Sequence, residues 1–235
     1  MDIGALVFDV FGTLVDWRSG VARDARGLLG PAVDSEALAD AWRQKYVPSM
    51  ERVRRGELPW TALDELHRTS LDELLDEFGV PDVDEPTRAA LVLAWHRLDP
   101  WPDVPAALAR LRRRHVLATL SNGNVSLLVD LARHGGIGWD AVLSAELFGH
   151  YKPDPEVYDG AVRLLGMAPG RVLMVAAHVE DLAAARKRGL RTAYVHRPHE
   201  RGPAASPPPA TDPEADLSVS SLTELADALS PEDAG

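Results

Sequence analysis

The 235-residue sequence contains no cysteine. This absence excludes disulfide bonds, thiolate metal sites and cysteine nucleophiles. Basic residues are also in the minority, because 25 Lys and Arg stand against 36 Asp and Glu and give a formal net charge of −11. Without a basic excess there is no general footprint for nucleic-acid phosphates. We therefore expect no nucleic-acid partner.

Long apolar runs are missing as well. No stretch approaches the roughly 20 apolar residues of a membrane span, and the first apolar run is broken at Asp9 with no basic region before it. We therefore expect a cytoplasmic protein with no membrane partner. A composition with 46% hydrophobic and 26% charged residues is ordinary for a soluble globular chain. The length suffices for one sizeable core domain, or for a core with a smaller inserted domain.

Short apolar runs alternate with helical segments along most of the chain. Strands are predicted at residues 3–9, 116–121, 140–146, 171–177 and 191–197. The helical segments after the second, third and fourth strands close at Gly135, Gly166 and Gly189. Alternating strands and helices favour parallel pairing. The prediction is an α/β fold with a Rossmann-like, doubly wound parallel sheet, completed by a short strand and helix within 217–229.

The block between the first two strands has a different pattern. From residue 18 to about 98 apolar residues recur at intervals of three and four, most clearly in 35–53, 61–79 and 85–98, as amphipathic helices require. We therefore predict a helical cap domain of the four-helix-bundle type at 16–98, inserted into a core formed by 1–15 and 99–235. The Pro-rich, polar stretch 198–216 is predicted to be an extended loop.

Polar side chains follow four of the predicted strands. Asp9 ends the first, the Ser121–Asn122 pair ends the second, Lys152 follows the third and Asp181 follows the fourth. In an open parallel sheet, ligands bind beyond the carboxyl ends of the strands. A carboxylate at the end of a buried strand is costly unless it is paired, hydrogen-bonded or used. The pattern therefore predicts one site in which these side chains meet.

Four motifs in this order resemble those of the haloacid dehalogenase superfamily: "DVFGT" at 9–13, "LSNGN" at 120–124, "YKPDPEVY" at 151–158 and "AAHVEDLAAA" at 176–185. The helical insert after the first motif resembles the superfamily's cap. Phosphatases of this superfamily resemble D-x-D-x-T and carry a magnesium-binding aspartate four residues before the last acid. This chain has Phe11 and Ala177 at those positions, so it lacks both the proton donor and a carboxylate that Mg²⁺ would prefer.

Both departures resemble the 2-haloacid dehalogenases that act on L-substrates. The resemblance implies that Asp9 displaces halide from a small (S)-2-haloacid through an aspartyl ester, with no cofactor or metal, and that Phe11 is apolar because no leaving alcohol needs a proton. It also implies that Asp181 activates the hydrolytic water beside Lys152. Related dehalogenases are often dimers, which makes a homodimer an expectation as well.

The resemblance assigns further side chains to substrate binding. Arg43, in the cap segment "WRQK", would stabilise the halide and the substrate carboxylate. The remaining substrate-binding candidates are Phe11, Thr13, Ser121, Asn122, Tyr158, His178 and Trp60. His178 stands where the family carries Asn, and it could orient water, act as a base or narrow the halide pocket.

Simpler roles remain open for several of these residues. Ser121 and Asn122 could cap the next helix, Arg43 could lie on a solvated helix face, and Tyr158 and Trp60 could be packing residues. Two other functions also remain open for the whole chain. It could be a magnesium-dependent phosphatase or phosphonatase with another source of the missing acid and ligand, or a non-catalytic binding protein that keeps the fold.

Overall fold

Six parallel strands form one sheet in the computed structural model, which describes residues 1–203 and 205–229. The strand order is β3-β2-β1-β4-β5-β6. The strands are β1 (Ala5–Phe8), β2 (Val116–Ser121), β3 (Ala141–Ser144), β4 (Val172–Ala176), β5 (Arg191–Val195) and β6 (Leu217–Val219). The chain therefore forms the predicted doubly wound α/β sheet. Its order reverses beside β1, where the connections run to opposite sides and a crevice opens at the carboxyl ends of the strands.

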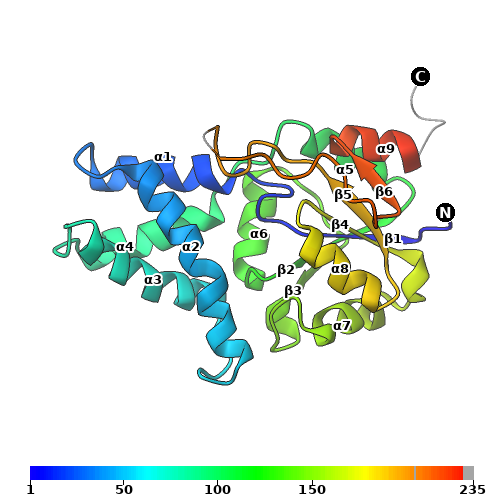
Figure 1. The fold of residues 1–235 in the computed structure, drawn as a ribbon, viewed down its shortest axis with the longest axis horizontal. Coiled ribbons are helices and arrows are strands. Elements are labelled where there is room, and N and C mark those ends of the chain that lie inside the picture. The colour runs from blue at the N-terminus through cyan, green and yellow to red at the C-terminus, as the bar shows by residue number, and fades with distance from the viewer. Residues whose placement is uncertain (204, 230–235) are drawn as a thin grey trace.

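Helices cover both faces of the sheet (Figure 1). On one face Val7 and Met174 pack in a cluster with residues of α7 (Pro155–Leu165) and α8 (Val179–Lys187). On the other, Leu6 and Val175 pack with α5 (Val104–Leu111), α6 (Val125–His134) and α9 (Leu222–Leu229). Adjacent strand residues point to opposite faces, so continuous apolar strands are buried on both sides. Short 3₁₀ turns complete the core at η2 (Ala145–Leu147) and η3 (Pro169–Arg171).

Four helices between β1 and β2 form a separate group to the left of the sheet in Figure 1. They are α1 (Trp17–Leu29), α2 (Ser35–Arg54), α3 (Leu63–Glu77) and α4 (Glu85–Val92), and the turn η1 (Leu93–His96) follows them. Each helix packs on the next and α4 returns to α1, as in a four-helix bundle. Aspartate side chains accept hydrogen bonds from first-turn amides of α1, α2 and α4, which satisfies groups that a helix start leaves unpaired.

Four of the strands predicted before residue 198 are shorter in the structure, whereas β2 has the predicted range of 116–121. The first strand ends at Phe8 and not at residue 9, and the chain then enters a turn that contains Gly12, whose φ is +80°. Asp9 is therefore the first residue beyond β1, at the carboxyl end of the strand. In the described part of the chain, no helix is long and apolar enough to cross a membrane.

Candidate active site

A cavity of about 380 Å³ lies where the carboxyl ends of the central strands meet helix α2 of the cap. Its core wall comes from the ends of β1 and β2, the loops after β3, β4 and β5, and the helices α7 and α8. Its cap wall comes from α2. The lining includes Asp9, Phe11, Arg43, Tyr46, Asn122, Lys152, Tyr158, His178 and Asp181. Most of the residues that the sequence singles out are thus brought to one place.

Asp9 receives hydrogen bonds on both carboxylate oxygens. Oδ1 accepts from the Lys152 ammonium at 2.9 Å, and Oδ2 accepts from the Thr13 hydroxyl at 2.7 Å. Nδ1 of His178 lies 3.1 Å from the same Oδ2. The Thr13 oxygen itself accepts the backbone N–H of Ala177, which leaves the hydroxyl proton directed at Asp9. Side chains from three segments, the turn after β1, the loop after β3 and the loop after β4, therefore fix this one carboxylate.

Lys152 also contacts the carboxylate of Asp181, so one ammonium is shared by two acids. The second oxygen of Asp181 accepts the Tyr158 hydroxyl at 2.6 Å. The backbone N–H of Lys152 donates to Asn122 Oδ1 at 2.8 Å, which anchors the loop after β3. The lysine side chain is only 7% exposed, and burial of an ammonium on this scale requires such partners.

The environment moves the two acids in opposite directions. Burial works against the charge of Asp9, but the Lys152 ammonium and the hydrogen bonds from His178 and Thr13 hold its pKa well below the usual range. Burial raises the pKa of Asp181, and the negative charge of Asp9 adds to that rise while Lys152 opposes it. Pairs of acids with divergent pKa values commonly divide the tasks of nucleophile and base.

Glu200 is a member of the site that the sequence analysis does not identify. It lies in the Pro-rich stretch after β5, is 6% exposed, and its oxygens lie 3.1 and 3.2 Å from Nε2 of His178. The Trp17 indole donates to Glu200 Oε1 at 3.1 Å. Burial lowers the pKa of His178, but the bonds to Asp9 and Glu200 outweigh it and raise the pKa to about 10. The sequence offers one signal for Glu200, which is its position shortly after the carboxyl end of β5, a strand of the same sheet.

Arg43 enters the cavity from α2. Its guanidinium carbon lies 4.2 Å from the centre of the Tyr46 ring and 5.4 Å from that of Trp17, a cation–π arrangement. Its Nη2 is 4.0 Å from Glu200 Oε1. Its Nη1 is buried and finds no hydrogen-bond partner among the described residues. Arg43 therefore does not lie on a solvated helix face, and one of its donors remains for a bound anion.

Three predicted substrate-binding residues are placed differently from the expectation. Thr13 is fully buried and gives its hydroxyl to Asp9, so it supports the carboxylate and not a substrate. Ser121 accepts the N–H of Gly123, which organises the turn before α6. Trp60 does not line the cavity; its ring lies 4.7 Å from that of Tyr151, because the α2–α3 loop packs against the loop after β3.

Phe11 and Ala177 occupy the positions that separate this chain from the phosphatase pattern. Phe11 is 2% exposed and packs edge-on against Trp95 and Tyr46, with ring centres 5.9 and 6.3 Å apart. Ala177 is buried and offers its backbone N–H to Thr13. Neither residue supplies an acid to the cavity.

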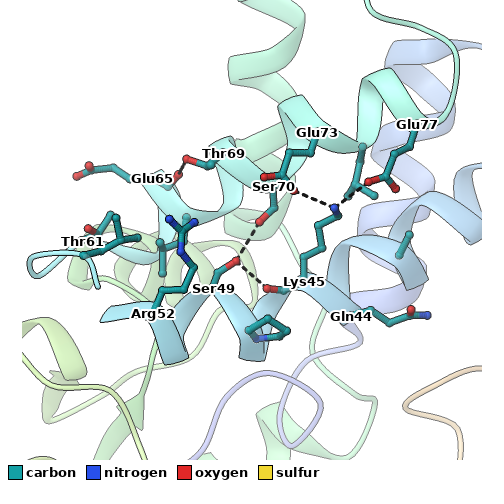
Figure 2. Close-up of a pocket in the computed structure, with 15 residues that line it drawn as sticks. Gln44, Lys45, Ser49, Arg52, Thr61, Glu65, Thr69, Ser70, Glu73 and Glu77 are labelled. Atoms are coloured by element: carbon teal, nitrogen blue, oxygen red, sulfur yellow. Dashed lines mark hydrogen bonds and ion pairs between the residues drawn. The ribbon is translucent and has the colours of Figure 1, made fainter. Parts of the chain in front are cut away.

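A second hollow of about 600 Å³ lies within the cap, between α2 and α3 (Figure 2). Lys45 there points to Glu73 and Glu77, at 2.8 and 2.9 Å, and Ser49 faces Ser70 at 3.2 Å. The lysine charge is already compensated, and every lining residue lies between positions 41 and 77. No strand end reaches this hollow, so we assign the site to the cavity at Asp9.

Comparison with known proteins agrees with this geometry. The family model of haloacid dehalogenase-like hydrolases matches residues 3–189. The chain belongs to this family. This haloacid dehalogenase-like hydrolase is 32% identical over 198 residues to the (S)-2-haloacid dehalogenase of Pseudomonas sp. (strain YL), with 83% of each protein covered.

Solved structures resemble this haloacid dehalogenase-like hydrolase along almost its whole length. The L-2-haloacid dehalogenase PA0810 superposes with a TM-score of 0.94 at 49% identity, covering 97% of this chain and 99% of the other. The defluorinating L-2-haloacid dehalogenase Rha0230 gives 0.93 at 40%, covering 97% and 95%. An L-2-haloacid dehalogenase from Xanthobacter autotrophicus, with chloropropionic acid covalently bound, gives 0.82 at 28%, covering 97% and 98%.

Proposed function

We propose that this family member hydrolyses the carbon–halogen bond of small (S)-2-haloacids, giving a 2-hydroxy acid and halide through an ester on Asp9. One observation carries the proposal. Asp9 is an ionised carboxylate at the wall of the cavity, and the residue two positions on is the buried ring of Phe11. An acid at that position would protonate a leaving alcohol, whereas departing halide needs no proton.

In the first step, Asp9 Oδ1 attacks C2 of the substrate and halide leaves with inversion at C2. The choice of oxygen follows from the hydrogen bonds. Oδ2 already accepts from Thr13 and faces His178, while Oδ1 is bonded only to Lys152 among the described residues. A carboxylate oxygen has about two lone-pair directions, so Oδ1 keeps one for the substrate.

The cap wall supplies the charge that the leaving group needs. Arg43 lines the same cavity as Asp9, and its Nη1 has no hydrogen-bond partner among the described residues. We assign the departing halide and the substrate carboxylate to this guanidinium. A cation placed where negative charge grows lowers the barrier more than one that only binds the ground state. Asn122 lines the same cavity with its Oδ1 already engaged, and its amide N–H group is assigned to the substrate carboxylate.

In the second step, water adds to Cγ of the ester and Asp181 accepts its proton. The raised pKa of Asp181, caused first by burial, makes it a better base than an exposed aspartate. Tyr158 donates to Asp181 and fixes its orientation. The Xanthobacter enzyme with chloropropionic acid covalently bound supports a covalent route for this chain too.

The donor set supports a reaction without metal. The Lys152 ammonium stands between Asp9 and Asp181 and pairs with both, and Ala177 offers no carboxylate. Within residues 1–203 and 205–229, the His, Asp and Glu side chains that gather closely enough to share an ion are His150, Asp154 and Glu156. That group lies outside the cavity lining.

The test measures halide release from L-2-chloropropionate, D-2-chloropropionate and fluoroacetate in EDTA. A parallel assay measures phosphate release from para-nitrophenyl phosphate with magnesium. We expect halide from the L-chloro substrate without metal and none from its D-isomer, while fluoroacetate reports whether the chain shares the activity named for Rha0230. Asp9→Asn should abolish halide release, and Asp159→Asn on the exposed face of α7 is the matched control.

Magnesium-dependent phosphate release without halide release would overturn the proposal in favour of a phosphatase. Halide release that survives in Asp9→Asn would overturn the ester mechanism alone. Retention of the fold by each variant is checked by circular dichroism before the assays.

A further inference from the structure

Glu200 is held in a site built for its carboxylate. Its side chain is 8% exposed and accepts the Trp17 indole N–H. A Cβ atom added to Gly12 would collide with the carboxylate, and Gly12 also has a φ of +80°, where other residues are strained. The nucleophile turn therefore leaves space for Glu200, whose carboxylate bonds the Trp17 indole and faces His178.

His178 stands between two groups that can only accept hydrogen bonds. Nδ1 faces Asp9 Oδ2 at 3.1 Å and Nε2 faces Glu200 Oε1 at 3.1 Å. An ionised carboxylate has no proton to give, so both ring nitrogens must donate and His178 is an imidazolium. Charged groups near this pair include the Arg43 guanidinium from α2, 4.0 Å from Glu200, and the Lys152 ammonium on the far oxygen of Asp9. Glu180 of α8 and Arg197 and Arg201 of the segment after β5 line a hollow together with His178 and Glu200.

We propose that Glu200 is a positioning residue that keeps His178 doubly protonated and its Nδ1–H directed at Asp9 Oδ2, so that this N–H and the Thr13 hydroxyl form the oxyanion site for hydrolysis of the ester. The inference rests on the proposed function and extends it to a residue without an assigned role. The oxyanion role follows from the choice of Oδ1 as the attacking oxygen. If Oδ1 bonds to the substrate, Oδ2 becomes the carbonyl oxygen of the ester and already has two donors in place.

The proposed second step is hydrolysis of the ester on Asp9. Water adds to Cγ, the carbonyl electron pair moves onto Oδ2, and Asp181 takes the water proton. The pair returns as the Cγ–Oδ1 bond breaks, and the product leaves with Oδ1 as its hydroxyl oxygen. Lys152, which contacts both Oδ1 and Asp181, passes this proton to the departing oxygen. The second water proton stays on the new Asp9 carboxyl group and is released to solvent when Asp9 ionises again. Preorganised donors at a developing oxyanion act without reorganisation cost.

The experiment compares Glu200→Gln with the wild-type enzyme on L-2-chloropropionate. Gln keeps the size and an oxygen for the Trp17 indole but removes the charge. We expect kcat to fall about tenfold to a hundredfold, the range seen when an outer partner of a catalytic ligand is lost. Halide release in the first turnover should be preserved, and the protein should accumulate the ester, detected as added mass in the intact chain.

Two further measurements separate positioning from a general structural effect. In a His178→Asn background, Glu200→Gln should cause no further loss, because its effect passes through the imidazole. Nitrogen NMR of the substrate-free protein at pH 8 should show both nitrogens of His178 protonated in the wild type. Glu214→Gln, a surface change in the same segment, is the control and should leave kcat and the NMR signals unchanged.

The outcomes distinguish this inference from the proposed function. In one outcome the wild type is active and Glu200→Gln slows the first turnover and the steady-state rate by the same factor. That result would overturn the oxyanion role and leave the proposed function standing. A neutral His178 tautomer in the wild type, or a full additional loss in the His178→Asn background, would overturn the positioning role. A wild-type enzyme that releases no halide would refute the proposed function, and the oxyanion role would fall with it.

Discussion

Nζ of Lys152 lies 2.9 Å from Oδ1 of Asp9, and both side chains are at least nine-tenths buried. The same ammonium contacts Asp181. A single cation thus joins two carboxylates beyond the ends of two neighbouring strands, in a site where all three side chains are largely buried. The oxygen that we assign as the nucleophile is also the one that Lys152 holds, so loss of this cation should affect both stability and rate.

We expect Lys152→Met to abolish halide release and to lower the free energy of unfolding by about 3–5 kcal/mol at pH 7, the cost of leaving buried charge uncompensated. The loss should stay nearly constant down to about pH 4 and should shrink as the pH falls below that value. The reason is that the stabilisation from the lowered pKa of Asp9 is complete above its unfolded value near ~3.9 and is lost as the pH falls toward the lower folded value. Urea unfolding at several pH values measures this. Lys187→Met, at an exposed lysine of α8, is the control, and equal losses in the two variants would refute the assignment.

Arg43→Lys tests whether the guanidinium of Arg43 binds the anionic groups of the substrate. Lys keeps the charge but loses the planar group that packs on Tyr46 and the second set of donors. We expect kcat/KM for L-2-chloropropionate to fall about tenfold to a hundredfold, equivalent to about 1.4–2.7 kcal/mol, with thermal stability little changed. Arg52→Lys, which lies on the same helix but lines the hollow of Figure 2, should behave as wild type. Full activity in Arg43→Lys would exclude a specific guanidinium role.

Much of the core site could be predicted from sequence because it rests on one rule, that parallel strands bring their carboxyl ends together. That rule placed Asp9, Asn122, Lys152 and Asp181 in one neighbourhood, and the structure does so. It could not tell which side chain faces the substrate. Thr13 was assigned to the substrate, but the turn at Gly12 directs its hydroxyl back to Asp9.

Other features depended on tertiary packing that no local pattern records. Glu200 lies in a stretch whose proline and polar content predicts only a loop, and its burial comes from contacts with Trp17 and His178, distant in sequence. Trp60 was assigned to the pocket because it is an aromatic residue of the cap. Its position against Tyr151 is set by the way the cap meets the core, which apolar spacing does not specify.

Phe11→Asp would restore the second acid of the phosphatase pattern without restoring its function. Phe11 is 2% exposed beside Trp95, so we expect the buried carboxylate to lower the free energy of unfolding by about 3–5 kcal/mol. Ala177 still offers no metal ligand, and para-nitrophenyl phosphate with magnesium should remain uncleaved. Phe11→Leu, which keeps the site apolar, should lose less stability in urea. Appearance of phosphatase activity would show that Phe11 alone separates the two chemistries.

His96 joins the cap to the core and should make stability depend on pH. Its Nδ1 lies 2.8 Å from Asp130 of α6 and its Nε2 lies 3.1 Å from Asp64 of α3. Burial lowers the pKa of His96, but the two carboxylates outweigh it and raise the pKa above its ordinary value. Stabilisation from a raised pKa is complete below the unfolded value of about 6.5 and is lost as the pH rises through the folded value.

The difference in unfolding free energy between wild type and His96→Gln should therefore be greatest at pH 5.5 and should decrease steadily through pH 7 and 8.5. Urea titrations at these three values measure it. His199→Gln, at an exposed histidine, should change stability by no more than about 0.5 kcal/mol at each pH. A difference that is constant with pH would mean that His96 joins the cap and core by packing alone. In that case protonation of the imidazole would gain no stabilisation from the two carboxylates.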